Sequence, residues 1–179
     1  LGDVYKRQEM GMEIRRRGGT GEVYAIERSG EALQLIQSNA QKFHGAWQGF
    51  HIVEGEAPGA MKELPAPTHA FIGGSGGRMK EIVETLLEAN PETRIVANAI
   101  TLETVGEILD CIREFGFRET ELVQVWAAPV ESVGRYHMPK AQNPVYVAAM
   151  QYPADAEEPA GGGGEIQLSL IHISEPTRL

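Results

Sequence analysis

Ala70-Phe71-Ile72-Gly73-Gly74-Ser75-Gly76-Gly77 is the stretch of sequence that decides the fold. A short apolar run leads into four glycines around one serine, and apolar residues then recur at helical spacing from Met79 to Leu87. This pattern predicts a strand, a tight turn and a helix. Glycines in such a turn accept positive φ and let a ligand approach the backbone, while the helix presents unpaired N–H groups to that ligand.

Two kinds of site fit this corner. The stretch from Gly73 to Gly77 matches the Gly-x-Ser-x-Gly pattern of a nucleophile elbow, which would make Ser75 the nucleophile of an α/β serine hydrolase. The same glycines equally suit a thin wall against which a flat ligand lies. A hydrolase also needs an acid and then a histidine after the serine. The candidates do not suit these roles, because Asp110 lies within a predicted helix and His137 lies in a polar segment instead of at a strand end.

The rest of the chain alternates strand and helix signals around this corner. Four strands are predicted at 23–27, 51–56, 69–72 and 94–100, three helices at 29–43, 78–90 and 101–114, and two last strands at 122–127 and 145–150. The last two strands should pair antiparallel, directly or through a hairpin, because no helix fits between them. The order predicts an α/β three-layer sandwich with a mostly parallel sheet and an antiparallel last strand.

Ligands of such a sheet bind beyond the carboxyl ends of its strands. Glu27 closes the first predicted strand, and a carboxylate at this place can accept hydrogen bonds from both hydroxyls of a ribose. An ordinary solvated glutamate fits the same position equally well. The strand-end argument therefore leaves the role of Glu27 open.

Composition excludes several classes of function. The chain has 179 residues, 42% of them hydrophobic, and a net charge of −9, which suits one domain that does not bind nucleic acid nonspecifically. It has no run of about 18 apolar residues that would indicate a membrane span. Cys111 is the single cysteine, so no disulfide forms within the chain and the cytoplasm is the expected compartment. Cys111 is expected to be a packed or partly exposed, inert thiol, and the histidines form no close metal-binding pair.

The two ends of the chain read as one short DNA element translated in opposite directions. A DNA string that encodes Asp3 to Gln8 has a reverse complement that encodes Leu168 to Ile173, and this string resembles the transposon-end adapter used in sequencing libraries. We therefore predict that residues 1–8 and 168–179 are adapter-like additions outside the fold.

The segment before the second addition is also expected to lie outside the core. Residues 153–167 are rich in alanine, glutamate and glycine, which predicts a flexible tail. The folded domain then comprises residues 9–152. It opens on the end of an amphipathic helix, predicted from Glu9 to Arg17.

Five motifs resemble one known family. They are Val23-Tyr24-Ala25-Ile26-Glu27, Glu54-Gly55-Glu56-Ala57-Pro58, Phe71-Ile72-Gly73-Gly74-Ser75-Gly76-Gly77, Asn98-Ala99-Ile100-Thr101-Leu102-Glu103-Thr104 and Gln142-Asn143-Pro144-Val145. In this order they resemble the decarboxylating precorrin methyltransferases of the cobalamin pathway. These are the carbon-15 methyltransferase that acts on cobalt-precorrin-6B and the C-terminal domain of the precorrin-6Y carbon-5,15 methyltransferase. The resemblance covers residues 9 to 152 and implies a Rossmann-like, S-adenosylmethionine-dependent methyltransferase.

The resemblance implies a role for each motif. Glu27 would hold the ribose of S-adenosylmethionine, Glu56 and Ala57 would lie near its adenine, and Gly73 and Gly74 would border this cofactor. The tetrapyrrole substrate would meet a second set of residues, namely Ser75, Gly76, Gly77, Asn98, Thr101, Glu103, Tyr136 and His137. The family reaction methylates carbon 15 and expels carbon dioxide from an acetate side chain. The resemblance supplies no catalytic residue and no metal site.

The resemblance also implies partners and shows one departure. It implies a homo-oligomer, a homotetramer by family likeness, and a carbon-5 methyltransferase that is fused or separate. The family's first strand and its glycine-rich turn should precede Glu9 and are absent. We therefore expect a sheet with an unpaired centre, low solubility and an impaired fragment. A non-catalytic assembly domain that kept the fold is a third interpretation.

We expect residues 9–167 to bind S-adenosylmethionine weakly or not at all. The reason is that the turn that would cradle the methionine part of the cofactor is missing. Calorimetric titration tests it, and micromolar binding would contradict it.

Overall fold

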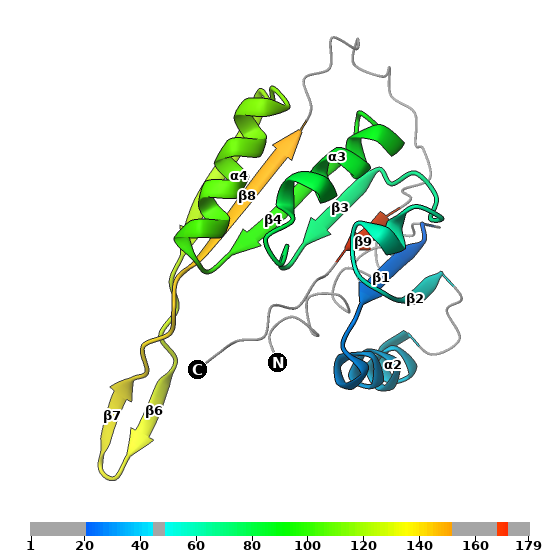
Figure 1. The fold of residues 1–179 in the computed structure, drawn as a ribbon. Coiled ribbons are helices and arrows are strands. Elements are labelled where there is room, and N and C mark those ends of the chain that lie inside the picture. Colours follow the sequence, from blue (N-terminus) through cyan, green and yellow to red (C-terminus); the bar gives the residue numbers. More distant parts are fainter. Residues whose placement is uncertain (1–20, 45–48, 152–167, 172–179) are drawn as a thin grey trace.

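The elements of the fold come from a computed structural model that describes residues 21–44, 49–151 and 168–171 (Figure 1). In chain order they are β1 (Val23–Glu27), α2 (Gly30–His44), β2 (Phe50–Glu54), η1 (Gly59–Met61), β3 (His69–Ile72), α3 (Met79–Ala89), β4 (Arg94–Ala99), α4 (Leu102–Glu114), β5 (Glu119–Val125), β6 (Val130–Val133), β7 (Tyr136–Pro139), β8 (Val145–Gln151) and β9 (Leu168–Ile171). The helix end predicted from Glu9 to Arg17 lies outside the described residues.

Seven strands form one sheet in the order β2-β1-β9-β3-β4-β8-β5. The pairs β1–β2 and β3–β4 are parallel, whereas β8 runs antiparallel to both β4 and β5. The mostly parallel α/β sheet and its antiparallel strand are therefore confirmed. Because the parallel strands share one direction, their carboxyl ends meet at one edge, which we call the carboxyl edge.

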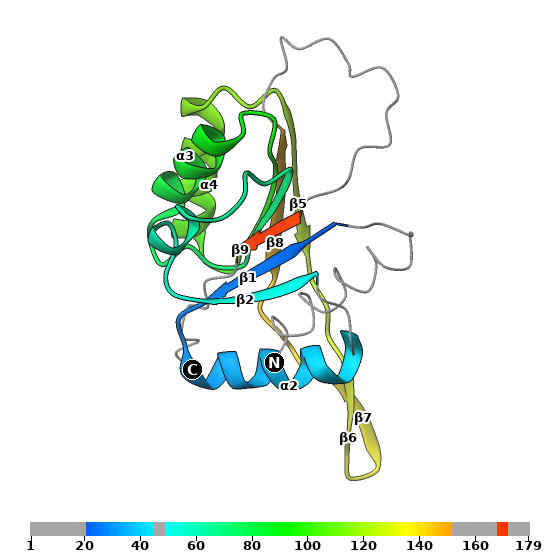
Figure 2. The ribbon, with the colours of Figure 1, turned by 90° about the vertical axis from the view of Figure 1, so that its right-hand side faces the viewer.

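Helices cover both faces of this sheet. Figure 2 shows α3 and α4 side by side against one face, with α2 on the other face beneath β1 and β2. One hydrophobic core cluster contains Ile82 and Leu86 of α3, Ile108 of α4 and Ile95 of β4, all of them buried. No helix in the described parts of the chain is long and apolar enough to cross a bilayer.

The predicted helix starts are confirmed in atomic detail. The Thr101 side-chain oxygen accepts the N–H of Thr104 at 3.2 Å before α4, and Ser29 Oγ accepts the N–H of Ala32 at 3.4 Å before α2. These caps fix where each helix leaves the carboxyl edge.

The predicted last pair of strands is present, but it is longer and carries an insertion. β5 begins at Glu119, three residues before the predicted start at 122, because pairing with β8 extends to Gln151. Between β5 and β8, the strands β6 and β7 form a separate hairpin around Gly134, whose φ of +61° permits the tight turn. Figure 1 shows this hairpin extending beyond the carboxyl edge.

The expected unpaired centre of the sheet is wrong. β9, formed by Leu168–Ile171, lies between β1 and β3 and pairs parallel with both. The prediction that these four residues lie outside the fold is therefore wrong as well. The physical reason is that two strand edges with unpaired N–H and C=O groups accept any extended segment that can reach them and carries β-forming residues.

Candidate functional site

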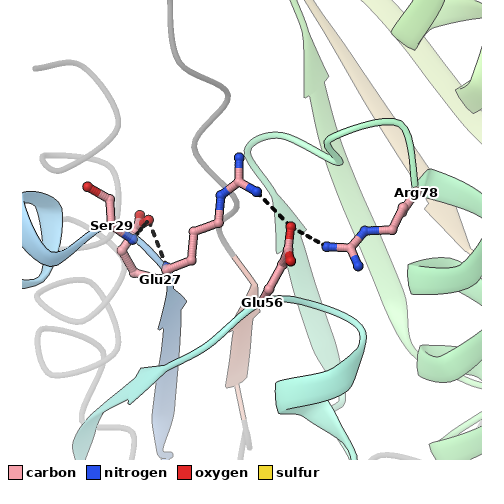
Figure 3. A network of polar contacts seen from close by, with 5 residues as sticks. Glu27, Ser29, Glu56 and Arg78 are labelled. Atoms are coloured by element: carbon pink, nitrogen blue, oxygen red, sulfur yellow. Dashed lines mark hydrogen bonds and ion pairs between the residues drawn. The ribbon is translucent and has the colours of Figure 1, made fainter.

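Glu27 ends β1 with its side chain inside the protein. It is completely buried, and its Oε1 atom accepts the backbone N–H groups of Arg28 and Ser29, each at 2.9 Å (Figure 3). A buried carboxylate needs such donors, because an unpaired buried charge is costly. The strand end and the following turn therefore hold this carboxylate at the carboxyl edge.

Glu56 lies in the loop after β2, the strand that pairs with β1. The loop is tied to β1 because the Gly55 N–H donates to the Glu27 carbonyl at 2.9 Å. Glu56 Oε1 accepts Arg28 Nη1 at 2.7 Å and forms an ion pair with Arg78 Nη2, without hydrogen-bond geometry. Figure 3 shows the Glu56 carboxylate between two arginine side chains that approach from opposite sides. Ala57, which follows Glu56, is fully buried.

The glycine stretch after β3 lies at the carboxyl edge, as do Glu27 and the Glu56 loop. Gly74 and Ser75 are buried, whereas Gly76 and Gly77 are exposed and have φ values of +58° and +79°. An added Cβ at Gly76 or Gly77 would meet no atom within 4 Å, so these glycines are required by backbone conformation rather than by crowding. The turn closes when the Arg78 N–H donates to the Ser75 carbonyl at 3.1 Å.

The Ser75 hydroxyl is fully buried and donates to Glu107 Oε2 on α4 at 3.1 Å. A nucleophilic serine needs a histidine as its base, and this serine instead meets a carboxylate. His69 begins β3 and His51 lies near the start of β2, so both lie at the opposite end of their strands. The described residues therefore give the hydrolase hypothesis no support. Ser75 instead connects the glycine turn to α4 through its hydrogen bond with Glu107.

The predicted substrate residues beyond the glycine turn fall into two groups. Asn98 is almost buried in β4, and Thr101 and Glu103 follow it at the start of α4, so all three lie at the carboxyl edge. Tyr136 and His137 are exposed on β7. The β6–β7 hairpin extends away from the main sheet (Figure 1). β6 and β7 form a two-stranded sheet of their own, separate from the strands that lead to the other predicted residues.

The comparisons with known proteins agree with this arrangement. A family model described as a precorrin methyltransferase domain matches residues 9–151. The chain belongs to the precorrin methyltransferase family. It is 34% identical over 136 residues to a probable cobalt-precorrin-6B C(15)-methyltransferase (decarboxylating) of Methanothermobacter thermautotrophicus, across 75% of this chain and 70% of that protein. It is 35% identical to a Pyrobaculum calidifontis protein of the same description, across 73% of this chain and 66% of that protein.

Solved structures extend the likeness to three dimensions. The precorrin-6Y C5,15-methyltransferase of Geobacter metallireducens matches with a TM-score of 0.65 and 32% identity, over 73% of this chain and 68% of that chain. A precorrin 8w decarboxylase of Methanobacterium thermoautotrophicum gives a TM-score of 0.65 and 34% identity, over 72% of this chain and 69% of that chain. A SAM-dependent O-methyltransferase of Thermotoga maritima, 19% identical with a TM-score of 0.55 over 77% and 52% of the two chains, shares the fold. The Rossmann-like methyltransferase fold is thereby confirmed.

Arg28, Arg78 and Glu107 are site residues of this precorrin methyltransferase domain that the sequence analysis missed. The first two hold Glu56, and the third holds Ser75. The sequence does contain a signal for the two arginines, because Arg28 directly follows Glu27 and Arg78 directly follows Gly77, both of them predicted site residues. Glu107 gave no signal, since it lies mid-helix among other acidic residues.

Cys111 is the one thiol of the chain, and it is buried, which is one of the two placements predicted for it. Burial and the nearby carboxylates of Glu107, Glu114 and Asp110 raise its pKa from 9.0 to about 11. A raised pKa lowers the thiolate fraction at pH 8 by about 100-fold relative to an unfolded thiol. We therefore expect iodoacetamide to alkylate Cys111 at least about 100-fold more slowly in the native chain than in urea. Equal alkylation rates in both states would contradict this.

Proposed function

We propose that this protein transfers a methyl group from S-adenosylmethionine to carbon 15 of a precorrin or cobalt-precorrin and releases carbon dioxide from an acetate side chain. The observation that carries the proposal is the buried carboxylate of Glu27, held at the carboxyl edge beside the Glu56 loop and the glycine turn. The names of its relatives describe this reaction, and the family supplies the class of substrate and cofactor.

The cofactor residues fit their proposed roles. Glu27 would accept the two ribose hydroxyls, because a carboxylate can serve a diol while it keeps its backbone donors. Glu56 and Ala57 would border the adenine, which requires Glu56 to share its carboxylate with Arg28 and Arg78. Gly73 and Gly74 would let the cofactor approach the end of β3. S-adenosylmethionine supplies an electrophilic methyl group when it is bound.

The proposed substrate wall follows the same edge. Ser75, Gly76 and Gly77 would lie against the flat tetrapyrrole, and Asn98, Thr101 and Glu103 would contact its polar periphery. No strong base is needed, because alignment of an electron-rich ring carbon with the methyl group lowers the barrier by proximity. A wall that excludes water also favours loss of the acetate carboxylate.

An isotope assay tests this function. The protein, expressed with its upstream reading frame included, is incubated with methyl-labelled S-adenosylmethionine and a cobalt-precorrin. We expect a product that gains one labelled methyl group and loses one carbon dioxide by mass spectrometry. Labelled methyl transfer without decarboxylation would contradict the proposed reaction, and ester hydrolysis that depends on Ser75 would favour the hydrolase.

We propose that the protein also forms a homo-oligomer through the β6–β7 hairpin. The hairpin exposes more than half of the surface of four large apolar side chains, namely Val130, Val133, Tyr136 and Met138. Val133 and Tyr136 face each other across the hairpin, and Met138 lies on the same side, whereas Val130 lies on the other side. A protein rarely exposes such a cluster unless another chain covers it. Tyr136 and His137 would then be able to contact the substrate of a neighbouring copy.

Light scattering after gel filtration tests the hairpin interface. We expect the Val133→Lys and Tyr136→Lys double variant to elute as a monomer, because two charges would be buried at the contact. Ser132→Lys, on the other side of the hairpin, is the matched control and should keep the oligomer. A monomeric unmodified protein would contradict the proposal.

Two further expectations belong to the same proposal. A carbon-5 methyltransferase, fused or separate, would act with this domain, as the C5,15 description of the relative from Geobacter metallireducens suggests. A cytoplasmic location is supported by the single cysteine, Cys111.

A further inference from the structure

Arg78 connects the residues proposed for the cofactor with those proposed for the substrate. It directly follows Gly77, and its backbone N–H closes the glycine turn on the Ser75 carbonyl at 3.1 Å. Its side chain forms an ion pair with Glu56 in the loop after β2 (Figure 3). Through its backbone this residue belongs to the proposed substrate side, and through its guanidinium it contacts the proposed adenine side.

The guanidinium of Arg78 has a donor that the protein does not satisfy. Its Nη2 atom is buried and has no hydrogen-bond partner among the described residues, because the ion pair with Glu56 lacks hydrogen-bond geometry. A buried donor without an acceptor is costly, so such a donor in a binding site points to an acceptor on the ligand. The side chain as a whole is 35% exposed, which leaves part of it open to a ligand.

Glu56 can release Arg78 at little cost. Arg28 Nη1 donates to the same Oε1 atom of Glu56 at 2.7 Å, so this carboxylate keeps a well-formed hydrogen bond when Arg78 turns to another partner. Both members of the ion pair between Arg78 and Glu56 are partly exposed, and exposed ion pairs contribute little to stability. Arg78 is therefore the exchangeable partner of the two arginines.

Several carboxylates lie at the carboxyl edge. Glu27 and Glu54 end β1 and β2, Glu56 follows β2, and Glu103 lies in the first turn of α4. A precorrin is itself an anion, because carboxylate side chains surround its ring, and these glutamates repel it. The substrate therefore needs a cation at this edge, and Arg78 is the arginine that adjoins the glycine turn.

We propose that Arg78 is a substrate-binding residue that leaves Glu56 to bind a carboxylate on the periphery of the tetrapyrrole. The planar guanidinium matches a carboxylate with two parallel N–H donors. The bound group is a carboxylate other than the acetate that loses carbon dioxide, because an ion pair would stabilise that acetate before the reaction and would be lost with the carbon dioxide. Arg78 thus orients the ring without reacting. This assignment rests on the proposed function for its class of substrate.

Titration with cobalt-precorrin-6B tests the assignment in the absence of S-adenosylmethionine, so that no methyl transfer takes place. The protein is used with its upstream reading frame included. We expect Arg78→Gln to weaken tetrapyrrole binding by at least about 10-fold. Arg94→Gln is the matched control, because it removes an arginine at the start of β4, at the opposite end of the sheet, and it should change the affinity by less than about 2-fold. An Arg78→Gln variant that binds like the unmodified protein overturns the proposal.

Glu56→Gln separates substrate binding from a structural role of Arg78. The substitution removes the carboxylate that competes for Arg78, so tetrapyrrole binding should tighten by about 3-fold or more. This gain should disappear in the double variant with Arg78→Gln, because the arginine that was released is gone. If Arg78 only held Glu56 in place, Glu56→Gln and Arg78→Gln would weaken binding alike. Equal weakening, or a gain that persists in the double variant, overturns the proposal.

The labelled-methyl assay identifies the kind of carboxylate that Arg78 binds. A carboxylate that does not react is held equally in the ground and transition states, so Arg78→Gln should raise KM for cobalt-precorrin-6B by about 10-fold and leave kcat within about 3-fold. A loss confined to kcat overturns the assignment. An unmodified protein that binds cobalt-precorrin-6B without methylating it would contradict the proposed function alone, since the titrations still test Arg78. An unmodified protein that does not bind this tetrapyrrole overturns the assignment.

Discussion

Replacing Glu27 with alanine is expected to lower the affinity for S-adenosylmethionine by at least about 100-fold and to destabilise the chain by about 2 kcal/mol. The affinity falls because the ribose hydroxyls lose their proposed acceptor. Stability falls because the N–H groups of Arg28 and Ser29, which the buried carboxylate accepts at 2.9 Å, lose their partner. Calorimetric titration and urea unfolding measure the two effects, with the upstream reading frame included in the protein.

Glu27→Gln separates these two effects. Its amide oxygen can still accept both backbone N–H groups, so we expect a loss of stability below about 1 kcal/mol. One carboxylate oxygen and the negative charge are gone, so the affinity should still fall by about 10-fold or more. Unchanged cofactor affinity in both variants would contradict the proposed role of Glu27.

Replacing Gly76 with valine is expected to reduce turnover by more than about 10-fold and to destabilise the protein by about 1–2 kcal/mol. The cause is backbone strain, because Gly76 has a φ of +58° and a β-branched residue rarely adopts this conformation. A steric clash is not the cause, because an added Cβ would meet no atom within 4 Å. The labelled-methyl assay and thermal unfolding provide the measurements.

Two variants serve as controls for Gly76→Val. Gly76→Asn should retain most of the activity, because asparagine tolerates positive φ better than valine does. Ser75→Ala should be mild, because Glu107 is partly exposed and water can replace the lost hydroxyl. Complete loss of methyl transfer in Ser75→Ala with the cofactor still bound would return this serine to the centre of the chemistry.

The carboxyl edge could be predicted from the sequence because its signals are local. The strand that runs into Gly73 and the cap at Thr101 each follow from a few neighbouring residues, and the structure has both. The position of Glu27 at a strand end follows in the same way, but its burial does not, because an ordinary solvated glutamate fits the same position in the sequence.

The partners of the edge residues could not be predicted, because they depend on long side chains from distant parts of the chain. Arg28 and Arg78 are 50 positions apart in sequence and meet the same carboxylate. Their conformations follow from the folded backbone and not from local spacing. The pairing of β9 could not be predicted for a related reason, because it depends on which strand edges in the folded sheet still have unpaired backbone N–H and C=O groups.

The antiparallel direction of β8 also determines where this fold can accept inserted residues. Because β8 runs opposite to β5, the end of one and the start of the other lie together at the carboxyl edge, and the hairpin leaves the sheet between them. An insertion at this junction can lengthen or shorten without changing the register of any strand. Natural variation there would diversify substrate preference and assembly while the catalytic scaffold stays constant.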